Sequence, residues 1–258
     1  MKTLKQLMDL RGRVALITGG AGHVGSTFAE ALAEVGATIV TVDSAQAPGK
    51  APSSQLHLEV DLSKEEMIRT LPKVVLEKFG RLDVLVNCAA FVGASNLQGW
   101  NEPFTSQSPE SWRSCMEVNL TAPFLLSQIF CQHLSESPNG SIINVASIYG
   151  LSGPDYSLYA DSKMGNPAAY AVSKGGILQM TRWLSTTLAP KVRVNSITPG
   201  GILRGQPASF IKRYEQRTPL QRMATEEDLK GAILYLASDL SSYVTGQNII
   251  VDGGWTTW

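Results

Sequence analysis

The chain has 258 residues, with 22 basic and 22 acidic side chains, so its formal net charge is zero. This balance argues against a protein that binds nucleic acid or an anionic membrane through bulk charge, and we expect neither as a partner. The length suits one large α/β domain over 1–258, and 43% hydrophobic residues can fill a substantial core.

The first residues, 1–13, mix charged side chains with short apolar steps and lack the continuous apolar stretch of a secretion signal. No later segment approaches the roughly 18 uninterrupted apolar residues of a membrane helix. The three cysteines have no CxxC spacing, and the three histidines have no spacing typical of metal ligands. These features predict a cytoplasmic protein with reduced thiols and no metal site.

Short apolar runs alternate with longer helical patterns along the chain. The run 14–17 precedes a helical pattern over 24–35, and the run 82–86 is apolar throughout, which is typical of a strand buried on both faces. This alternation predicts βαβ units and a single-domain, three-layer Rossmann fold of the α/β class, with a seven-stranded, mostly parallel sheet between helices. The other expected strands are 38–42, 56–60, 141–146, 192–197 and 248–251.

Capping residues indicate where several helices begin. Ser63 is followed by two glutamates, whose charge favours the first turn of a helix. Ser108 precedes Pro109, and serine as cap with proline in the first turn predicts a helix start. We expect further helices over 168–188 and 225–237.

A glycine-rich turn, 18–25, joins the first strand to the first helix. Gly20, Gly22 and Gly25 fit the pattern GxGxxG in the context that the pattern requires. Glycines allow the backbone to approach a pyrophosphate, and the helix N-terminus offers free N–H groups. A tight turn that binds nothing is the alternative. The expected cofactor contacts in this turn are Gly19, Gly22, His23, Val24 and Gly25.

Asp43 ends the second strand, 18 residues after Gly25. A carboxylate at this position accepts hydrogen bonds from the adenosine ribose and repels a 2′-phosphate. No basic residue stands beside it, the nearest downstream being Lys50. We therefore expect NAD (NAD+/NADH) in preference to NADP.

Tyr170 and Lys174 lie four residues apart on an expected helix and so share one face. A nearby ammonium stabilises a phenolate, so we expect Lys174 to lower the pKa of Tyr170 toward the working pH. Ser147, just after the strand 141–146, is placed to hydrogen-bond a substrate oxygen.

Ordered short motifs run through nearly the whole chain. They are the glycine turn, Asp61-Leu62, Asn87-Cys-Ala-Ala90, Val118-Asn-Leu120, Asn144-Val-Ala-Ser147, Tyr170-Ala-Val-Ser-Lys174, Arg193-Val-Asn195, Pro199-Gly200, Thr245-Gly-Gln247 and Val251-Asp-Gly-Gly254. Together they resemble the short-chain dehydrogenase/reductase superfamily in its short form of roughly 250 residues.

The resemblance implies an NAD-dependent oxidoreductase that interconverts a secondary alcohol and a ketone. Tyr170 is then the general acid/base, and Lys174 tunes its pKa and contacts the nicotinamide ribose. Ser147 positions the substrate oxygen, and Asn119 supports a water-borne proton relay. The nicotinamide carries the hydride while the protein supplies placement and electrostatics.

The same resemblance completes the expected cofactor site. Asp61 and Leu62 flank the adenine, and further contacts come from Asn87, Ala89 and the backbone near Ile202. Relatives of the short form are commonly homotetramers or homodimers, built on two long helices that correspond here to 108–135 and 168–188.

Two other functions stay open. The turn also reads Thr-Gly-x-x-Gly-x-x-Gly, the spacing of the extended branch, which includes nucleotide-sugar epimerases that produce no net redox change. The short length and the Asp-Gly-Gly ending favour the short form. A non-catalytic NAD sensor or scaffold is the second alternative.

The spacing between Ser147 and Tyr170 is 23 residues, against 12 to 13 in the family. Tyr159, in the pattern Tyr159-Ala-Asp-Ser-Lys163, has the usual spacing. However, Pro167 follows soon after and disfavours a helix there, so Tyr170 is preferred. The extra residues, 154–167, form an insertion beside the active site that either shapes substrate selection or is a surface loop without consequence.

A basic segment follows Pro199-Gly200, where the family closes a lid over the substrate, here 201–222. Over 204–222 its formal charge is +4, which favours an anionic substrate, although a solvated helix face is the alternative. Arg204 stands where the family carries threonine. The insertion and the segment 199–202 resemble a branch associated with flagellin modification and surface-polysaccharide sugars, so the small-molecule substrate is expected to be anionic or sugar-like.

Overall fold

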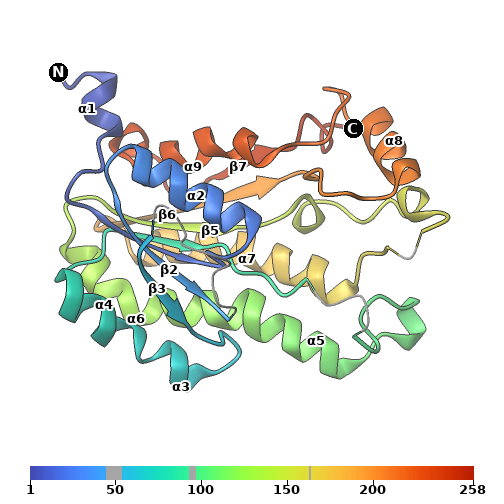
Figure 1. The fold of residues 1–258 in the computed structure, drawn as a ribbon, viewed down its shortest axis with the longest axis horizontal. Coiled ribbons are helices and arrows are strands. Elements are labelled where there is room, and N and C mark those ends of the chain that lie inside the picture. Colours follow the sequence, from blue (N-terminus) through green and yellow to red (C-terminus); the bar gives the residue numbers. More distant parts are fainter. Residues whose placement is uncertain (45–53, 93–96, 163) are drawn as a thin grey trace.

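The computed structural model describes residues 1–44, 54–92, 97–162 and 164–258. A seven-stranded sheet lies at its centre in the order β3-β2-β1-β4-β5-β6-β7, and every neighbouring pair is parallel. Helices cover both faces, which confirms the predicted three-layer Rossmann fold (Figure 1). The strands are β1 (Val14–Thr18), β2 (Thr38–Asp43), β3 (Ser54–Glu59), β4 (Val84–Asn87), β5 (Gly140–Val145), β6 (Val192–Pro199) and β7 (Asn248–Val251).

Two groups of helices bury the two faces of the sheet. Helices α2 (His23–Glu34) and α9 (Lys230–Ala237) pack on one face, and α4 (Leu71–Phe79), α6 (Ala122–Glu136) and α7 (Ala168–Thr187) pack on the other (Figure 1). Each group shares a hydrophobic core with the sheet. The helical layers thus leave the ends of the strands, rather than the faces of the sheet, to form sites.

Successive residues of β1 show why the strands are apolar throughout. Val14 and Leu16 pack into the core beneath α4 and α6, whereas Ala15 and Ile17 pack into the core beneath α2 and α9. Because neighbouring side chains point to opposite faces, a strand covered on both sides needs an apolar residue at every position.

Several expected helices are divided by local structure. The helix expected from Ser63 is present as α3 (Glu65–Ile68) and α4, where Pro72 lacks an amide hydrogen for a continuous helix. The long helix expected over 108–135 is α5 (Pro109–Met116) and α6, joined by a π-helical turn, η2 (Glu117–Thr121). The remaining elements are α1 (Leu4–Met8), α8 (Ala208–Arg217), η1 (Phe104–Ser106), η3 (Ile148–Gly150), η4 (Tyr156–Tyr159), η5 (Glu226–Leu229) and η6 (Asp239–Ser241).

The capping signal at Ser108 is confirmed, whereas that at Ser63 is wrong, because Lys64 is the N-cap of α3 and the Ser63 hydroxyl donates to Asp61 instead. The hydroxyl of Ser108 accepts a hydrogen bond from the amide of Ser111 at 3.0 Å. None of the helices in the ranges above has both the length and the apolar character that crossing a bilayer requires.

A buried carboxylate ties together the amino ends of β1 and β4 and the end of α6. Asp83 is fully buried just before β4 and accepts hydrogen bonds from the amide of Val14 (2.8 Å) and the hydroxyl of Ser137 (2.6 Å). Arg81 pairs with it at 2.6 Å. Burial alone would raise the pKa of Asp83, but these hydrogen bonds outweigh it and hold the pKa below its ordinary value.

Replacing Asp83 by asparagine should lower the free energy of unfolding at pH 7 by about 2–4 kcal/mol, because Arg81 loses its buried partner. A lowered pKa in the folded state stabilises the protein above the unfolded-state value of about 3.9, and this contribution is lost as the pH falls below it. Urea unfolding should therefore show the wild type and the variant converging in stability below about pH 4.

The matched control is Asp161→Asn, since the Asp161 side chain is 86% exposed and pairs with Arg213 at the surface. We expect this substitution to change stability by less than about 0.5 kcal/mol. Equal losses from the two substitutions would contradict a special role for Asp83.

Candidate active site

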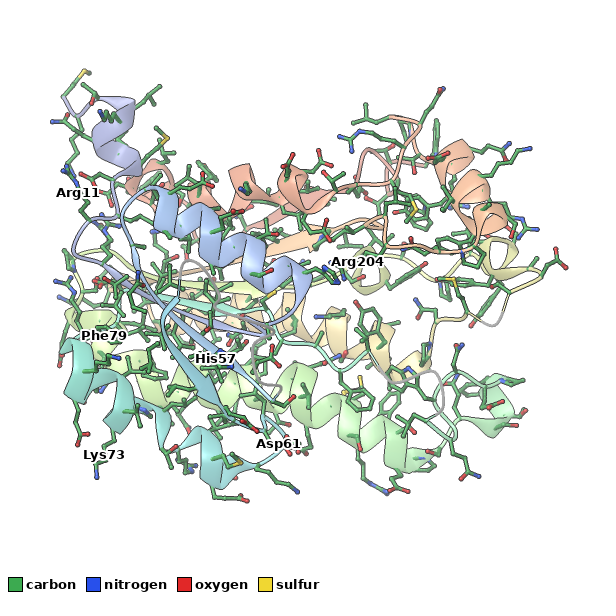
Figure 2. The ribbon with its side chains drawn as sticks, viewed as in Figure 1. Arg11, His57, Asp61, Lys73, Phe79 and Arg204 are labelled. Carbon is green, nitrogen blue, oxygen red and sulfur yellow. The ribbon has the colours of Figure 1, made fainter. Side chains whose placement is uncertain are left out.

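The carboxyl ends of the central strands open into a cleft of about 540 Å³. It lies at the ends of β1 and β4, which are neighbours at the centre of the sheet. From β1 the chain continues outward to β2 and β3 on one side, and from β4 it continues to β5, β6 and β7 on the other. Parallel α/β sheets bind ligands at such a switch point. Asp61 and Arg204 both line this cleft, and Figure 2 shows them at the opposite end of the sheet from Arg11 and Phe79.

The glycine turn forms one wall of the cleft, and its glycines are required by close backbone contacts. Gly19 has φ +69°, and a Cβ there would lie 2.8 Å from the Cα of Ala89. A Cβ on Gly25 would overlap the carbonyl oxygen of Gly19. The first turn of α2 therefore packs directly on the end of β1.

The N-terminus of α2 faces the cleft. Gly22 is its N-cap residue and provides no side-chain hydrogen bond to the first turn. His23, Val24 and Gly25 all line the cleft, so their backbone N–H groups lie at a position suited to an anionic group such as a pyrophosphate.

Two carboxylates stand along the same wall. Asp43 lines the cleft and accepts hydrogen bonds from the amides of Ala21 (2.9 Å) and Ser44 (2.8 Å), so it also holds the glycine turn in place. Asp61 is held by the amide and hydroxyl of Ser63, and these hydrogen bonds lower its pKa. Lys50, the nearest basic residue after Asp43, lies outside the described residues.

The other expected cofactor residues divide into two groups. Leu62, Ala89 and Ile202 line the cleft. Asn87 is only 3% exposed and lies behind the wall, where its side chain donates to Asn144 at 2.8 Å. Its part in cofactor binding stays a prediction, and the structure gives it a supporting position. The glycine turn, the N-terminus of α2 and the carboxylate of Asp43 together fit a dinucleotide.

Ser147, Tyr170 and Lys174 meet at the inner end of the cleft. Ser147 follows β5, whereas Tyr170 and Lys174 lie one turn apart near the start of α7. Ser147 hydrogen-bonds the phenol of Tyr170, and the Nζ of Lys174 donates to the carbonyl of Val145 at 2.8 Å. The ammonium lies 5.8 Å from the centre of the Tyr170 ring.

The ionisation of these groups differs from the sequence prediction. Burial raises the pKa of Tyr170, and the hydrogen bond with Ser147 offsets only part of this effect. Burial also lowers the pKa of Lys174, to about 8. The expected lowering of the tyrosine pKa by Lys174 is therefore wrong for the protein alone, because burial dominates and the ammonium donates to a backbone carbonyl.

Tyr159, the rival with the better spacing, lies in the short turn η4 rather than on a helix. Its hydroxyl hydrogen-bonds that of Tyr149. Lys163, the other half of this pattern, lies outside the described residues. Tyr170 lies in the first turn of the 20-residue helix α7, as its sequence context predicts.

Asn119 lies in the π-helical turn η2 and is 1% exposed. Its Oδ1 accepts from the amide of Phe91 at 2.5 Å, and its Nδ2 donates to the hydroxyl of Ser173 at 3.0 Å. The side chain thus fixes η2 against α7 and does not line the cleft. The proton-relay role stays a prediction, and π turns are frequent at functional sites.

A second pocket of about 430 Å³ adjoins the first and shares Ser147 and Tyr170 with it. Its other walls come from η3, the 154–167 insertion, α8 and short stretches near residues 100, 200 and 223. Sequence reasoning missed most of these residues, because only the tertiary fold brings the segments together. The aromatic spacing of Phe210 and Tyr214 on one helix face is the one signal that could have suggested them. The missed residues include Trp100, Tyr149, Met164, Asn166, Gln206, Phe210, Tyr214 and Met223.

The basic segment 204–222 does not present a row of unpaired charges. Each of its four arginines pairs with an acid outside the segment, at N–O distances of 2.6–3.0 Å. The expectation of an anion-binding lid is therefore not supported. The formal charge of +4 was counted from residues 204–222 alone and did not include the acids elsewhere in the chain that pair with these arginines. The pairs are Arg204–Glu226, Arg213–Asp161, Arg217–Asp155 and Arg222–Asp228.

Comparison with known proteins places the chain among oxidoreductases. A family model described as enoyl-(acyl carrier protein) reductase matches residues 20–256. A 3-oxoacyl-[acyl-carrier-protein] reductase from Thermotoga maritima is 32% identical, over 96% of this chain and 99% of its own. The chain belongs to the short-chain dehydrogenase/reductase family. The resemblance seen in its motifs is thereby confirmed, and it is an oxidoreductase with a fold that binds a nicotinamide cofactor.

Solved structures of the family contain either form of this cofactor. A short-chain dehydrogenase from Leptospira borgpetersenii with bound NAD+ is 34% identical, with a TM-score of 0.87 over 99% of this chain and 96% of that one. A gluconate 5-dehydrogenase from Burkholderia cenocepacia in complex with NADP and tartrate is 28% identical, with a TM-score of 0.85 over 99% and 100%. A post-translational flagellin modification protein from Campylobacter coli is also similar, at 27% identity over 95% of this chain and 99% of its own.

Gly25→Ala should weaken cofactor binding at least tenfold and destabilise the fold by about 1–3 kcal/mol, because the new methyl group overlaps the Gly19 carbonyl. Titration of NAD+ by calorimetry and urea unfolding would measure the two effects. Gly231→Ala in α9 is the control, since a Cβ there meets nothing within 4 Å. It should stabilise the protein by about 0.5–1 kcal/mol, and a loss similar to that of Gly25→Ala would contradict the steric argument.

Proposed function

We propose that this protein is an NAD-dependent dehydrogenase/reductase that interconverts a secondary alcohol and a ketone on a small-molecule substrate. The observation that carries the proposal is the convergence of Ser147, Tyr170 and Lys174 where the cofactor cleft meets the second pocket. A hydroxyl, a phenol and an ammonium at such a junction suit the transfer of a proton to or from a substrate oxygen.

The chain's own groups then have distinct tasks. The hydroxyls of Ser147 and Tyr170 hold the substrate oxygen, and the proton passes between that oxygen and the Oη of Tyr170. Lys174 places a positive charge next to the phenol while its hydrogen bond to Val145 fixes its position. A bound nicotinamide supplies or accepts the hydride.

Asp43 supports the preference for NAD. Its carboxylate lines the cleft immediately after β2 and is held there by two backbone amides. A 2′-phosphate at this position would meet a fixed negative charge, whereas ribose hydroxyls would meet a hydrogen-bond acceptor.

Tyr170→Phe should lower kcat for ketone reduction by about 10²–10⁴-fold, because it removes the group that transfers the proton. Since burial raises the pKa of Tyr170, the wild-type reduction rate should stay level through neutral pH and fall only in alkali, where the phenol loses its proton. Alcohol oxidation needs the phenolate and should rise with pH over the same range. Steady-state rates with a panel of ketones and keto-sugars would measure these effects.

Tyr156→Phe is the matched control, since it removes the hydroxyl of a tyrosine that is 65% exposed and lines neither pocket, and its rates should match those of the wild type. Identical rates for Tyr170→Phe and the wild type would contradict our assignment. Bound NAD with no cofactor turnover on any substrate would favour an epimerase or a sensor instead.

Asp43→Ser should reduce the preference for NAD+ over NADP+ in kcat/KM by about 10-fold or more, because the charge that repels the 2′-phosphate is lost. The measurement is coenzyme kinetics at fixed substrate concentration. Asp61→Asn is a useful comparison, as its carboxylate is held by Ser63 further along the cleft and should affect both coenzymes alike. An unchanged ratio in Asp43→Ser would contradict the role of Asp43.

A further inference from the structure

The second pocket has neutral walls over the part of the chain that the structure describes. None of the described residues that line it is charged, and aromatic rings and methionines form much of its surface. A carboxylate or phosphate bound in its interior would be buried without a cationic partner from any of these lining residues, which is costly. The pocket therefore favours an uncharged substrate.

Most polar groups of this pocket already have partners. Gln206 donates to the carbonyl of Ile202 and accepts from the amide of Arg204, both at 2.7 Å. The hydroxyl of Tyr214 accepts from the amide of Gly201 at 2.5 Å. These contacts fix the walls and leave few groups to recognise a substrate.

Asn166 is the exception. It is 8% exposed, it lines the pocket, and its side chain lies near the phenols of Tyr149 and Tyr159, where it acts to lower the pKa of each. Its Oδ1 is buried and has no hydrogen-bond partner among the described residues. An amide has donors and an acceptor, so its nitrogen can face the tyrosines while its unpaired oxygen can accept from a hydroxyl of a ligand. A buried polar atom left unpaired costs about 1–3 kcal/mol, which a bound hydroxyl would recover.

The insertion holds Asn166 in a fixed position. Gly165 packs so closely on the Asn101 side chain that a Cβ would overlap it, and Pro167 forms the N-cap of α7 directly after Asn166. On the other side, the ring of Tyr159 packs on Phe210 with centroids 5.5 Å apart. The position of Asn166 is therefore fixed by Gly165 and Pro167 on either side of it in the chain and by the packing of Tyr159 on α8.

The arginines of the lid explain why the pocket is neutral. Arg213 pairs with Asp161 at 3.0 Å and Arg217 pairs with Asp155 at 2.6 Å, so both cations join α8 to the insertion. Arg217 also lies over the Trp255 ring, 4.7 Å from its centroid. The two arginines thus hold α8 against the insertion, and their charges are paired there.

We propose that Asn166 is a specificity residue that hydrogen-bonds a second hydroxyl of a neutral, ring-sized substrate, while Ser147 and Tyr170 hold the reacting oxygen. This inference rests on the proposed function, because it places the reacting carbon at the junction of the two pockets. The substrate class is an uncharged cyclic polyol or hydroxyketone, which includes neutral sugars. The insertion then determines which substrate is accepted.

The test compares cyclohexanol with the cis and trans isomers of cyclohexane-1,2-, 1,3- and 1,4-diol, and with 4-hydroxycyclohexanecarboxylate as the anionic probe. With NAD+ and with NADP+, we expect at least one diol to exceed cyclohexanol in kcat/KM by about 10-fold and to exceed the carboxylate as well. Asn166→Leu and Asn166→Ala should bring the diol-to-cyclohexanol ratio to within about twofold of unity. Two variants of different size keep the test valid if one fails to fold.

Tyr156→Phe is the matched control, because this residue of the same insertion is 65% exposed and lies outside the pocket lining. It should retain the diol preference. A wild type that favours cyclohexanol or the carboxylate, or Asn166 variants that keep the diol preference, would overturn the inference while leaving the proposed function intact.

Binding measurements separate the two proposals when no alcohol is oxidised. That outcome contradicts the proposed function. Calorimetric titration of the same diols and cyclohexanol into the protein saturated with NAD+ then tests Asn166 directly. Tighter binding of a diol that is lost in Asn166→Leu supports the inference, and equal binding of diol and cyclohexanol overturns it.

Discussion

The contact between α7 and the end of β5 is the constraint on which both pockets depend. The Nζ of Lys174 donates to the carbonyl of Val145, and a Cβ on Gly150 would lie only 2.7 Å from the main chain of Lys174. The turn after β5 therefore lies directly on the helix, with no side chain between them. Because Ser147 is on that turn and Tyr170 is on that helix, this packing sets their separation.

Buried polar side chains hold α7 further along its length. Asn144 on β5 donates to Thr181 at 2.9 Å, and Asn119 in the π turn donates to Ser173 at 3.0 Å. Each of these groups is satisfied inside the protein, where a satisfied polar network makes a core rigid and specific. The groups proposed to transfer the proton are thus carried by a strand end and a helix, whereas the proposed substrate contacts are carried by the insertion and the lid. Such a division keeps the chemistry fixed while the specificity can change with the loops.

Much of this arrangement could be predicted from the sequence, because its signals are local. An apolar run such as 82–86 indicates a strand buried on both faces, and Gly25 is recognisable as part of a turn that only glycine can form. The proline at 167 correctly indicated that Tyr170, rather than Tyr159, begins the long helix. Each of these inferences needs only neighbouring residues and elementary backbone sterics.

Features that depend on distant partners could not be predicted. Arg217 and Asp155 are 62 residues apart in the chain, so the net charge of the lid could not show that Arg217 pairs with an acid of the insertion. The sequence could not indicate a role for Asn166. Its oxygen lacks a hydrogen-bond partner among the described residues, and this is known only once the surrounding segments are placed. The pKa of Tyr170 could not be predicted either, since its direction is set by burial rather than by the lysine one turn away.

The ionisation of Tyr170 and Lys174 bears on the direction of the proposed reaction. Burial disfavours the charged form of each group, so it raises the pKa of the phenol and lowers that of the ammonium. At neutral pH Tyr170 therefore keeps its proton, which is the state that a general acid needs for the reduction of a ketone. Oxidation of an alcohol needs the phenolate, and any positive charge brought near the phenol would shift the balance toward it. The burial of these two groups, as well as their identity, would therefore set how the rates of the proposed reduction and oxidation depend on pH.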